Sequence, residues 1–152
     1  MKKKIIKIFL ILSLSVLISC GFEPLNKKIN LNKFIVSEKI FSGNTKINNK
    51  IYNKLNLKEE KNAPGFILKL FSEVKIITLA KDTSGNATSY KSYILTNVAV
   101  IKNEEIIKNK KFEKSITYSN LSNKFELKNY QNQVENNLIN STVQVIKLFL
   151  GN

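Results

Sequence analysis

The chain has 152 residues with 25 lysines, no arginine and no histidine, and its formal net charge is +14. That length suits one ordinary domain with a single core. The lack of histidine and the single cysteine exclude a clustered zinc site, and the glycine patterns of dinucleotide and P-loop sites are absent. We expect no cofactor. Without arginine forks to read bases, nucleic acid is a poor candidate partner.

The amino terminus has the pattern of an export signal. Four lysines lie within residues 2–7, and an apolar run follows from Ile8 to Ile18. A spanning helix needs roughly 20 apolar residues, so this run is too short, and its flanks are those of a cleaved signal peptide. We predict that residues 1–19 are removed.

The next four residues carry the only cysteine. Leu17-Ile18-Ser19-Cys20 resembles a bacterial lipobox, which implies cleavage before Cys20, a thioether-linked diacylglycerol on its sulfur and an acyl group on the new amino terminus. Several acyl chains would make anchoring essentially permanent, whereas one chain holds only marginally. Gly21 is not the Asp that retains enterobacterial lipoproteins in the inner membrane, which favours the outer membrane. The alternatives are a secreted soluble protein and an uncleaved amino-terminal anchor.

The processed chain would remain strongly basic. Removing four of the 25 lysines leaves 21 against 11 acidic residues, or about +10. Such a field attracts polyanions, and for an exported lipoprotein these are anionic lipid or glycolipid phosphate. An AT-rich coding sequence would also favour lysine and asparagine.

A tether is predicted over residues 20–32, where Pro24 blocks a helix, and a single domain over 33–152. Residues 33–43 alternate as a strand up to Gly43. Asn44 or Thr45 would cap a helix ending near Leu57, whose apolar face carries Ile47, Ile51 and Leu55. Residues 58–64 form a charged loop closed by Pro64-Gly65.

Three strands follow, over residues 66–80, 90–102 and 105–118. The first has a nearly continuous apolar face and should be central in its sheet. The last is expected to place Ile106, Phe112, Ile116 and Tyr118 on one side. The turn at Asn103-Glu104 is short enough for a tight hairpin. Consecutive strands with short connections favour an antiparallel meander.

A long helix closes the chain after the cap-like Asn123-Lys124-Phe125-Glu126. One row of its residues runs from Tyr130 through Ser141 to Leu148, and a second comprises Ile139, Val143, Ile146 and Leu150. The order β-α-β-β-β-α predicts an α+β two-layer sandwich, with a four-stranded, mostly antiparallel sheet and two helices packed on one face.

Two segments resemble a known family. Residues 20–25, Cys-Gly-Phe-Glu-Pro-Leu, are similar to the mature amino terminus of the alphaproteobacterial lipopolysaccharide-assembly lipoproteins, LptE, although Asn26 stands where the family usually has Tyr. Tyr118-Ser119-Asn120, with Ser122 and Phe125, is similar to the family's Ser-Tyr-Asn segment and the start of its last helix. The resemblance implies a lipoprotein on the periplasmic side of the cell outer membrane. It would plug and help assemble the β-barrel translocon LptD and assist insertion of lipopolysaccharide into the outer leaflet.

Lysines of the strand region, where the helices are least expected to cover them, are the candidate contacts for lipid A phosphates. They are Lys81, Lys102, Lys108, Lys110 and Lys111. Each of them is more simply explained as a solvated surface lysine. Protection of an edge strand from pairing with other chains is as good an explanation of the last three as a ligand site.

Two other functions stay open. One is an accessory lipoprotein of another envelope system, such as a lipid-transport ABC or barrel-assembly complex, which the lipobox alone would support. The other is a lipid-anchored hydrolase. Its possible nucleophile–base pair, Ser89 and Lys91, shares a strand face, but that spacing arises by chance in a lysine-rich chain, and we expect no enzyme.

Overall fold

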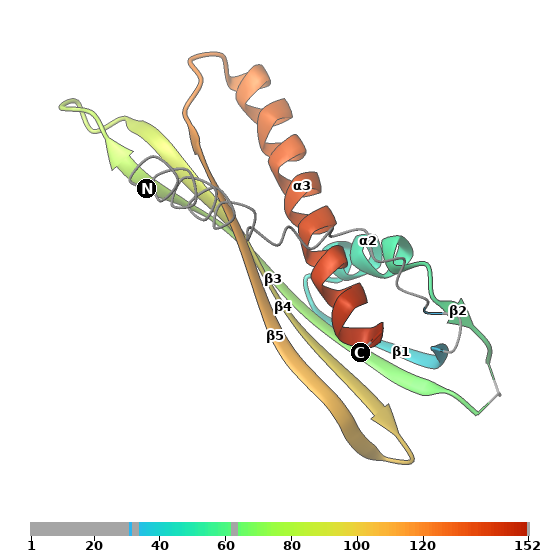
Figure 1. Ribbon diagram of the computed structural model, residues 1–152. Coiled ribbons are helices and arrows are strands. Elements are labelled where there is room, and N and C mark those ends of the chain that lie inside the picture. Colours follow the sequence, from blue (N-terminus) through green and yellow to red (C-terminus); the bar gives the residue numbers. More distant parts are fainter. Residues whose placement is uncertain (1–30, 32–33, 62–63, 152) are drawn as a thin grey trace, which may run out of the picture.

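The computed structural model describes residues 31, 34–61 and 64–151, which form a twisted sheet with two helices on one of its faces (Figure 1). The elements are β1 (Ile35–Gly43), α2 (Thr45–Leu55), β2 (Lys58–Glu59), β3 (Phe66–Lys81), β4 (Ala87–Lys102), β5 (Glu105–Ser119) and α3 (Lys124–Gly151). The strands lie in the order β2-β1-β3-β4-β5. The predicted α+β class is confirmed. The predicted number of strands is wrong, because the sheet has five.

The missed strand is β2, which the sequence placed in a charged loop. It is two residues long, pairing Lys58 with Ile35 and Glu59 with Val36 in parallel. Both side chains are exposed, so the segment has no apolar alternation that could have indicated a strand. Only backbone pairing makes it one.

The β3–β4–β5 meander is antiparallel as predicted, whereas β1 runs parallel to β3. α2 provides the crossover between these two parallel strands. At the β4–β5 turn, Asn103 and Glu104 have φ angles of 50° and 67°, the two left-handed residues of a type I′ hairpin. The predicted tight hairpin is therefore present without a glycine.

β1 ends where the chain turns abruptly into α2. Gly43 has a φ of 70°, and a Cβ there would collide with the carbonyl oxygen of Ser72. The Asn44 amide donates to that same oxygen at 2.7 Å, and the Asn44 side chain accepts from the Ile47 amide at 3.1 Å. Asn44, rather than Thr45, is thus the helix cap. β3 continues for nine residues past Ser72 without β1 beside it.

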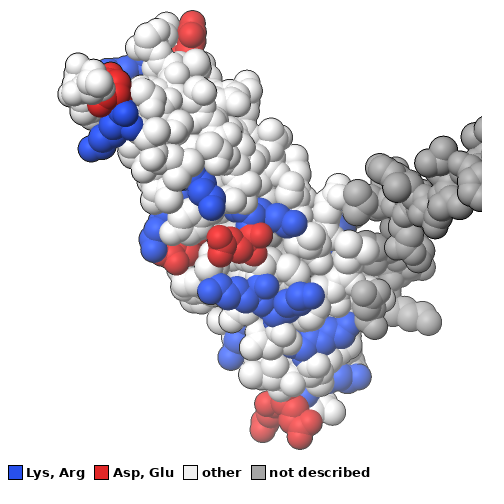
Figure 2. Space-filling view, turned by 60° about the vertical axis from the view of Figure 1, so that its left-hand side comes forward, with Lys and Arg blue, Asp and Glu red and all other residues white. Residues whose placement is uncertain are grey.

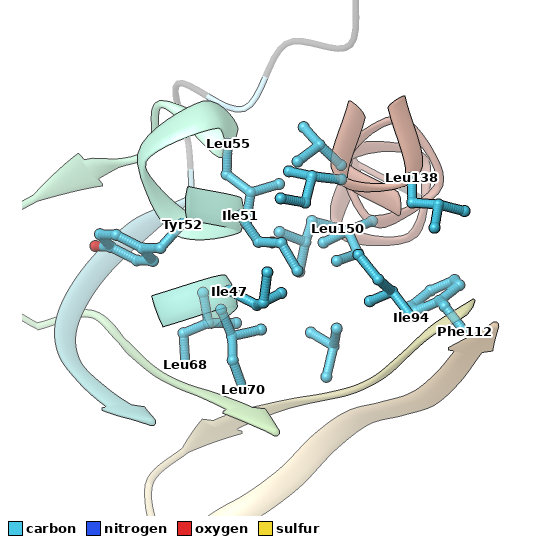
Figure 3. Close-up of a cluster of buried hydrophobic side chains, with 14 of the residues drawn as sticks. Ile47, Ile51, Tyr52, Leu55, Leu68, Leu70, Ile94, Phe112, Leu138 and Leu150 are labelled. Carbon is cyan, nitrogen blue, oxygen red and sulfur yellow. The ribbon is translucent and has the colours of Figure 1, made fainter. Parts of the chain in front are cut away.

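The core lies between the helices and one face of the sheet, as the close-up in Figure 3 shows. The predicted apolar face of α2 is confirmed, since Ile47, Ile51 and Leu55 are at most 1% exposed. They pack with side chains from β3, β4, β5 and α3, which include Leu68, Leu70, Ile94, Phe112, Leu138 and Leu150. Burying each such side chain contributes roughly 1.5–3 kcal/mol.

α3 buries the second of its two predicted rows and, from the first, Val134 and Leu138, while Tyr130 and Ser141 of the first row are exposed. Asn123 caps this helix by accepting from the Phe125 amide at 2.9 Å. The expectation for Ile106 is wrong, because this residue is 61% exposed. A register shift in β4 between Val100 and Ile101 pairs Ile106 with Ile101 and so moves it off the helix-covered face.

Candidate functional site

The five lysines predicted from the sequence do not form one cluster. Lys81 ends β3 and Lys102 ends β4, at opposite ends of the same antiparallel pair. The register runs from Ile67 opposite Ile101 to Lys81 opposite Ala87, which separates the two lysines by roughly 45 Å at about 3.3 Å per residue. One bound headgroup could not contact both.

Lys81 precedes the loop between β3 and β4, and the next residue, Asp82, orders that loop. The Asp82 carboxylate accepts from the Asn86 amide at 2.8 Å and from the Ser84 amide at 2.9 Å. These hydrogen bonds, with that from Asn86 contributing most, hold the pKa of Asp82 below its usual value. Asp82 is the next residue in the chain, so its negative charge partly offsets the attraction of Lys81 for a phosphate.

Lys108 stabilises a helix end. Its ammonium donates to the carbonyl oxygens of Phe149 and Leu150 at 3.2 and 3.3 Å, and it lies 5.7 Å from the Phe149 ring centroid. These carbonyls belong to the last turn of α3, where helix oxygens lack partners within the helix. The strand lysines were expected to lie clear of the helices, and for Lys108 that placement is wrong.

Two other lysines lie over aromatic rings. The Lys102 ammonium is 5.3 Å from the Phe66 ring centroid, and the Lys110 ammonium is 5.7 Å from that of Phe112. Both side chains are exposed, so each contact contributes about 0.5–1 kcal/mol. The ammonium groups remain accessible to solvent and to a ligand.

Lys110 and Lys111 meet at a hollow on the sheet. The hollow is about 420 Å³ and is lined by Phe71, Leu95, Asn97, Asn109, Lys110 and Lys111. We call it the β3–β5 hollow. Phe71 and Leu95 give it an apolar floor on the face that the helices leave bare, and Phe71 is 38% exposed. The amide side chains of Asn97 and Asn109 and the ammonium group of Lys111 complete it. Lys110 borders the hollow, but its side chain alternates to the other face of the sheet, where its ammonium lies over Phe112.

This combination suits an amphiphile with an anionic headgroup. An apolar floor offers contact area for a chain, while amides and ammonium groups hydrogen-bond phosphate oxygens. The floor and Asn97 and Asn109 were not predicted as part of a site. Only the register across β3, β4 and β5 brings them together, and no spacing along the sequence encodes that register.

Charge is unevenly distributed over the molecule. Figure 2 shows blue lysines gathered over the lower half of one face, together with fewer red acidic groups, while much of the upper half is uncharged. Of the residues described, no group of three or more His, Cys, Asp or Glu is placed to hold a metal ion. In that same part of the chain, no helix combines the length and apolar character needed to cross a membrane. Cys20, the predicted lipidation site, lies outside the described residues.

Comparison with known proteins places the fold among bacterial lipoproteins. No protein-family model matches the chain, and no curated protein matches its sequence. The structure is similar to that of a minor lipoprotein from Acinetobacter baumannii, with a TM-score of 0.62 at 8% identity over 77% of this chain and 90% of the other. The TM-score with rare lipoprotein B from Shewanella oneidensis is 0.55, at 16% identity over 72% of this chain and 91% of the other. The TM-score with lipoprotein B from Nitrosomonas europaea is 0.58, at 9% identity over 73% of this chain and 79% of the other. The chain thus has the α+β fold of lipoproteins of the rare lipoprotein B type.

Proposed function

We propose that this chain is a lipoprotein anchored through Cys20 to the periplasmic side of the outer membrane. There it plugs and helps assemble an LptD-like β-barrel translocon and assists insertion of lipopolysaccharide into the outer leaflet. The role is a binding and assembly role without catalysis. No nucleic acid, metal or cofactor takes part.

The observation that carries the proposal is the fold shared with bacterial lipoproteins, joined to the Leu17–Cys20 motif of the sequence. The LptE-like segments at residues 20–25 and 118–125 extend that reasoning to a particular family. Physical properties agree with it, because a small basic domain suits an aqueous lumen and attracts lipid phosphates.

The β3–β5 hollow supplies a contact for the glycolipid. Lys111 lines it beside Phe71 and Leu95, so a lipid A phosphate would lie at the Lys111 ammonium with its acyl region toward the apolar floor. Lys102 lies at the end of the same β4–β5 pair and would add to the field. Lys81 is too distant to share that ligand, and Lys108 is engaged by α3.

Co-purification tests the partner. We would solubilise the envelope in mild detergent, isolate the chain by a carboxy-terminal tag and identify what accompanies it by mass. A large β-barrel at equal stoichiometry supports the plug function, and Cys20→Ser, which removes the anchor, should lower its recovery. An inner-membrane ABC complex instead would establish the accessory-lipoprotein alternative, and no barrel at all would overturn the proposal.

A second measurement tests the glycolipid contact. The variant Lys111→Ala should bind lipopolysaccharide several-fold more weakly than the unaltered protein, because a charge-assisted contact in the hollow is lost. Lys54→Ala is the matched control, since it removes the same charge from an exposed position on α2. Equal losses in both variants would mean that only net charge matters and that the hollow is not the site.

A further inference from the structure

The outer face of α2 presents only basic and amide side chains. The helix turns Ile47, Ile51 and Leu55 toward the core, and α2 contains no acidic residue. On the side away from the core, lysine and asparagine recur at helical spacing over an arc of about 140°. These residues are Lys46, Asn49, Lys50, Asn53 and Lys54.

The outer face of α3 continues this surface with uncharged amides. Between Lys128 and Lys147 the helix contains a single charged residue, Glu135. Lysine and asparagine are both abundant in the chain, so a compositional bias alone would have placed lysines on this face as well. The exposed amides lie within an arc of about 100°. They are Asn129, Gln133, Asn136, Asn137, Asn140 and Gln144.

An ion pair joins the two helices. The Lys50 ammonium donates to the Glu135 carboxylate at 2.7 Å, which offsets the one acidic charge on this side of α3. Glu59 and Glu60, which follow α2, are each paired with a lysine as well. Within the described residues, the other two lysines of α2 have no carboxylate partner. We call the outer face of α2 together with the amides of α3 the helix-layer surface.

The opposite side of the molecule has a different character. On the bare face of the sheet, Glu73, Leu95 and Glu113 form one cross-strand row beside the β3–β5 hollow. Carboxylates therefore lie on the bare face, whereas the helix-layer surface has none that is unpaired. The sheet separates the two sides, so a glycolipid bound in the hollow does not contact α2.

We propose that the helix-layer surface lies against the anionic phospholipid headgroups of the leaflet in which Cys20 is anchored. The inference rests on the anchor of the proposed function and concerns the anchored chain before it meets a barrel. Ammonium groups make charge-assisted hydrogen bonds to phosphate oxygens, and amides donate to phosphate and ester oxygens. No unpaired carboxylate on this surface repels the headgroups.

The position of the anchor favours a lipid surface over a soluble polyanion. Leu31, the first described residue, packs against the core. The chain from Cys20 to Leu31 spans at most about 40 Å even when fully extended, and α3, with 28 residues, is about 42 Å long. The domain therefore stays within about its own length of the headgroups, where its effective concentration is high. Lysines of such a domain are attracted to an anionic leaflet within about a Debye length.

Fluorescence quenching in vesicles tests the contact. The lipidated protein carries a fluorophore on an introduced thiol, because the thioether at Cys20 leaves no other. Asn137→Cys labels the helix-layer surface and Ser115→Cys labels the bare face. The vesicles contain a headgroup-linked quencher in phosphatidylcholine, with or without about 40% phosphatidylglycerol. Since the lipid anchor holds the chain on both, composition changes only the docking.

The anionic lipid should quench the label at residue 137 several-fold more strongly and leave the label at residue 115 unchanged. About 0.5 M salt should remove the difference. Lys46→Gln/Lys54→Gln should remove most of the quenching, because it deletes the two unpaired ammonium groups of α2. Lys69→Gln/Lys91→Gln is the matched control, since it removes the same charge from the bare face.

A second pair of variants tests the amides. Asn136→Glu/Asn140→Glu places carboxylates on the helix-layer surface and should abolish the quenching through repulsion by the headgroups. Ser115→Glu/Thr117→Glu adds the same charge to the bare face and should change the quenching little. All four positions are exposed, and circular dichroism verifies that each variant folds.

Three results would overturn the inference. They are equal quenching at residues 137 and 115, quenching that does not depend on phosphatidylglycerol, and equal losses in the two lysine variants. The mass of the purified chain shows separately whether Cys20 carries lipid, and a chain without lipid would overturn both the anchor and the docking. A lipidated chain that does not dock would leave the proposed function standing.

Discussion

Lys108 links a strand to a helix end that is distant in sequence. Its ammonium lies against the carbonyls of Phe149 and Leu150, where the negative end of the helix dipole favours a cation. α3 has no basic residue in its own last turn. The strand therefore supplies the charge that the helix lacks.

Lys108→Met should lower the free energy of unfolding by about 1–2 kcal/mol, since half-buried carbonyls lose a charged donor. Urea unfolding followed by circular dichroism measures this without any ligand. Lys111→Met is the control on the same strand, and we expect it to change stability by less than about 0.5 kcal/mol as an exposed residue. Equal effects in the two variants would show that Lys108 does not cap α3.

Glu104 occupies a position that favours glycine. Its φ is 67°, a left-handed conformation that has a higher conformational free energy for a residue with a Cβ than for glycine. Glu104→Gly would create Asn-Gly, the preferred type I′ pair, and should raise stability by about 0.5–1 kcal/mol. Thermal unfolding measures the gain. Glu105→Gly, one residue later inside β5, should destabilise, and a gain in that variant would contradict the explanation.

At the scale of elements, the turn at Gly43 sets the length of β1 and therefore how much of β3 it pairs with. Gly43 brings the chain close to Ser72, and Asn44 then starts α2. A strand that continued past this point would have covered residues 73–81 of β3. The helix cap and the end of the β1–β3 pairing thus share one cause.

Gly43→Ala should destabilise the fold by about 2 kcal/mol or more, because it combines a left-handed φ with a collision against backbone. Gly85→Ala is a close control, since Gly85 has a φ of 85° and open space around it. That change should cost about 1 kcal/mol. Chemical denaturation of both variants gives the comparison, and the account fails if Gly43→Ala is the milder change.

The alternation of apolar and polar residues, together with helix-capping residues, predicted most helices and strands, because both patterns depend only on residues close together in the sequence. Phe66–Lys81 was recognised as a long central strand from its apolar face, and Asn123 as a helix cap from its side chain. Lys58–Glu59 was missed because its pairing depends on where β1 lies. Ile106 was misplaced by a register shift that no local pattern records.

The candidate site was less predictable than the fold. Lysine composition pointed to Lys110 and Lys111, which do line the β3–β5 hollow, but it could not distinguish them from Lys108, which caps α3. Lys108 differs from the other two because the last turn of α3, 41 residues later in the sequence, packs against it in the fold. The floor residue Phe71 belongs to the site only through cross-strand register.

At the scale of the whole molecule, pH acts on stability through Asp82 on the acid side and through Tyr52 on the alkaline side. The chain has no histidine. The pKa of Asp82 is lowered in the folded state by its hydrogen bonds, so its contribution is present above pH 3.8 and is lost as pH falls further. Burial, with the nearby Glu59 carboxylate, raises the pKa of Tyr52 to about 12. The contribution of Tyr52 is therefore present below pH 10 and is lost as pH rises toward 12.

The melting temperature should accordingly be nearly constant between about pH 5 and pH 9. It should fall on the alkaline side above pH 10, and Tyr52→Phe should reduce that fall because the ring stays buried without an ionisable group. Circular dichroism melts across this range provide the measurement. A transition near neutral pH would mean that a group with an unrecognised shift contributes to folding.

The position of α3 after the meander has a kinetic consequence. The β3–β4–β5 meander joins neighbours in sequence, so its loops close at little entropic cost and it can form early. Its apolar face is covered in part by the 28-residue helix α3, which is synthesised after the meander. Until α3 arrives, the sheet exposes Ile94 and Phe112, and we expect chains truncated within this helix to be aggregation-prone and quickly degraded.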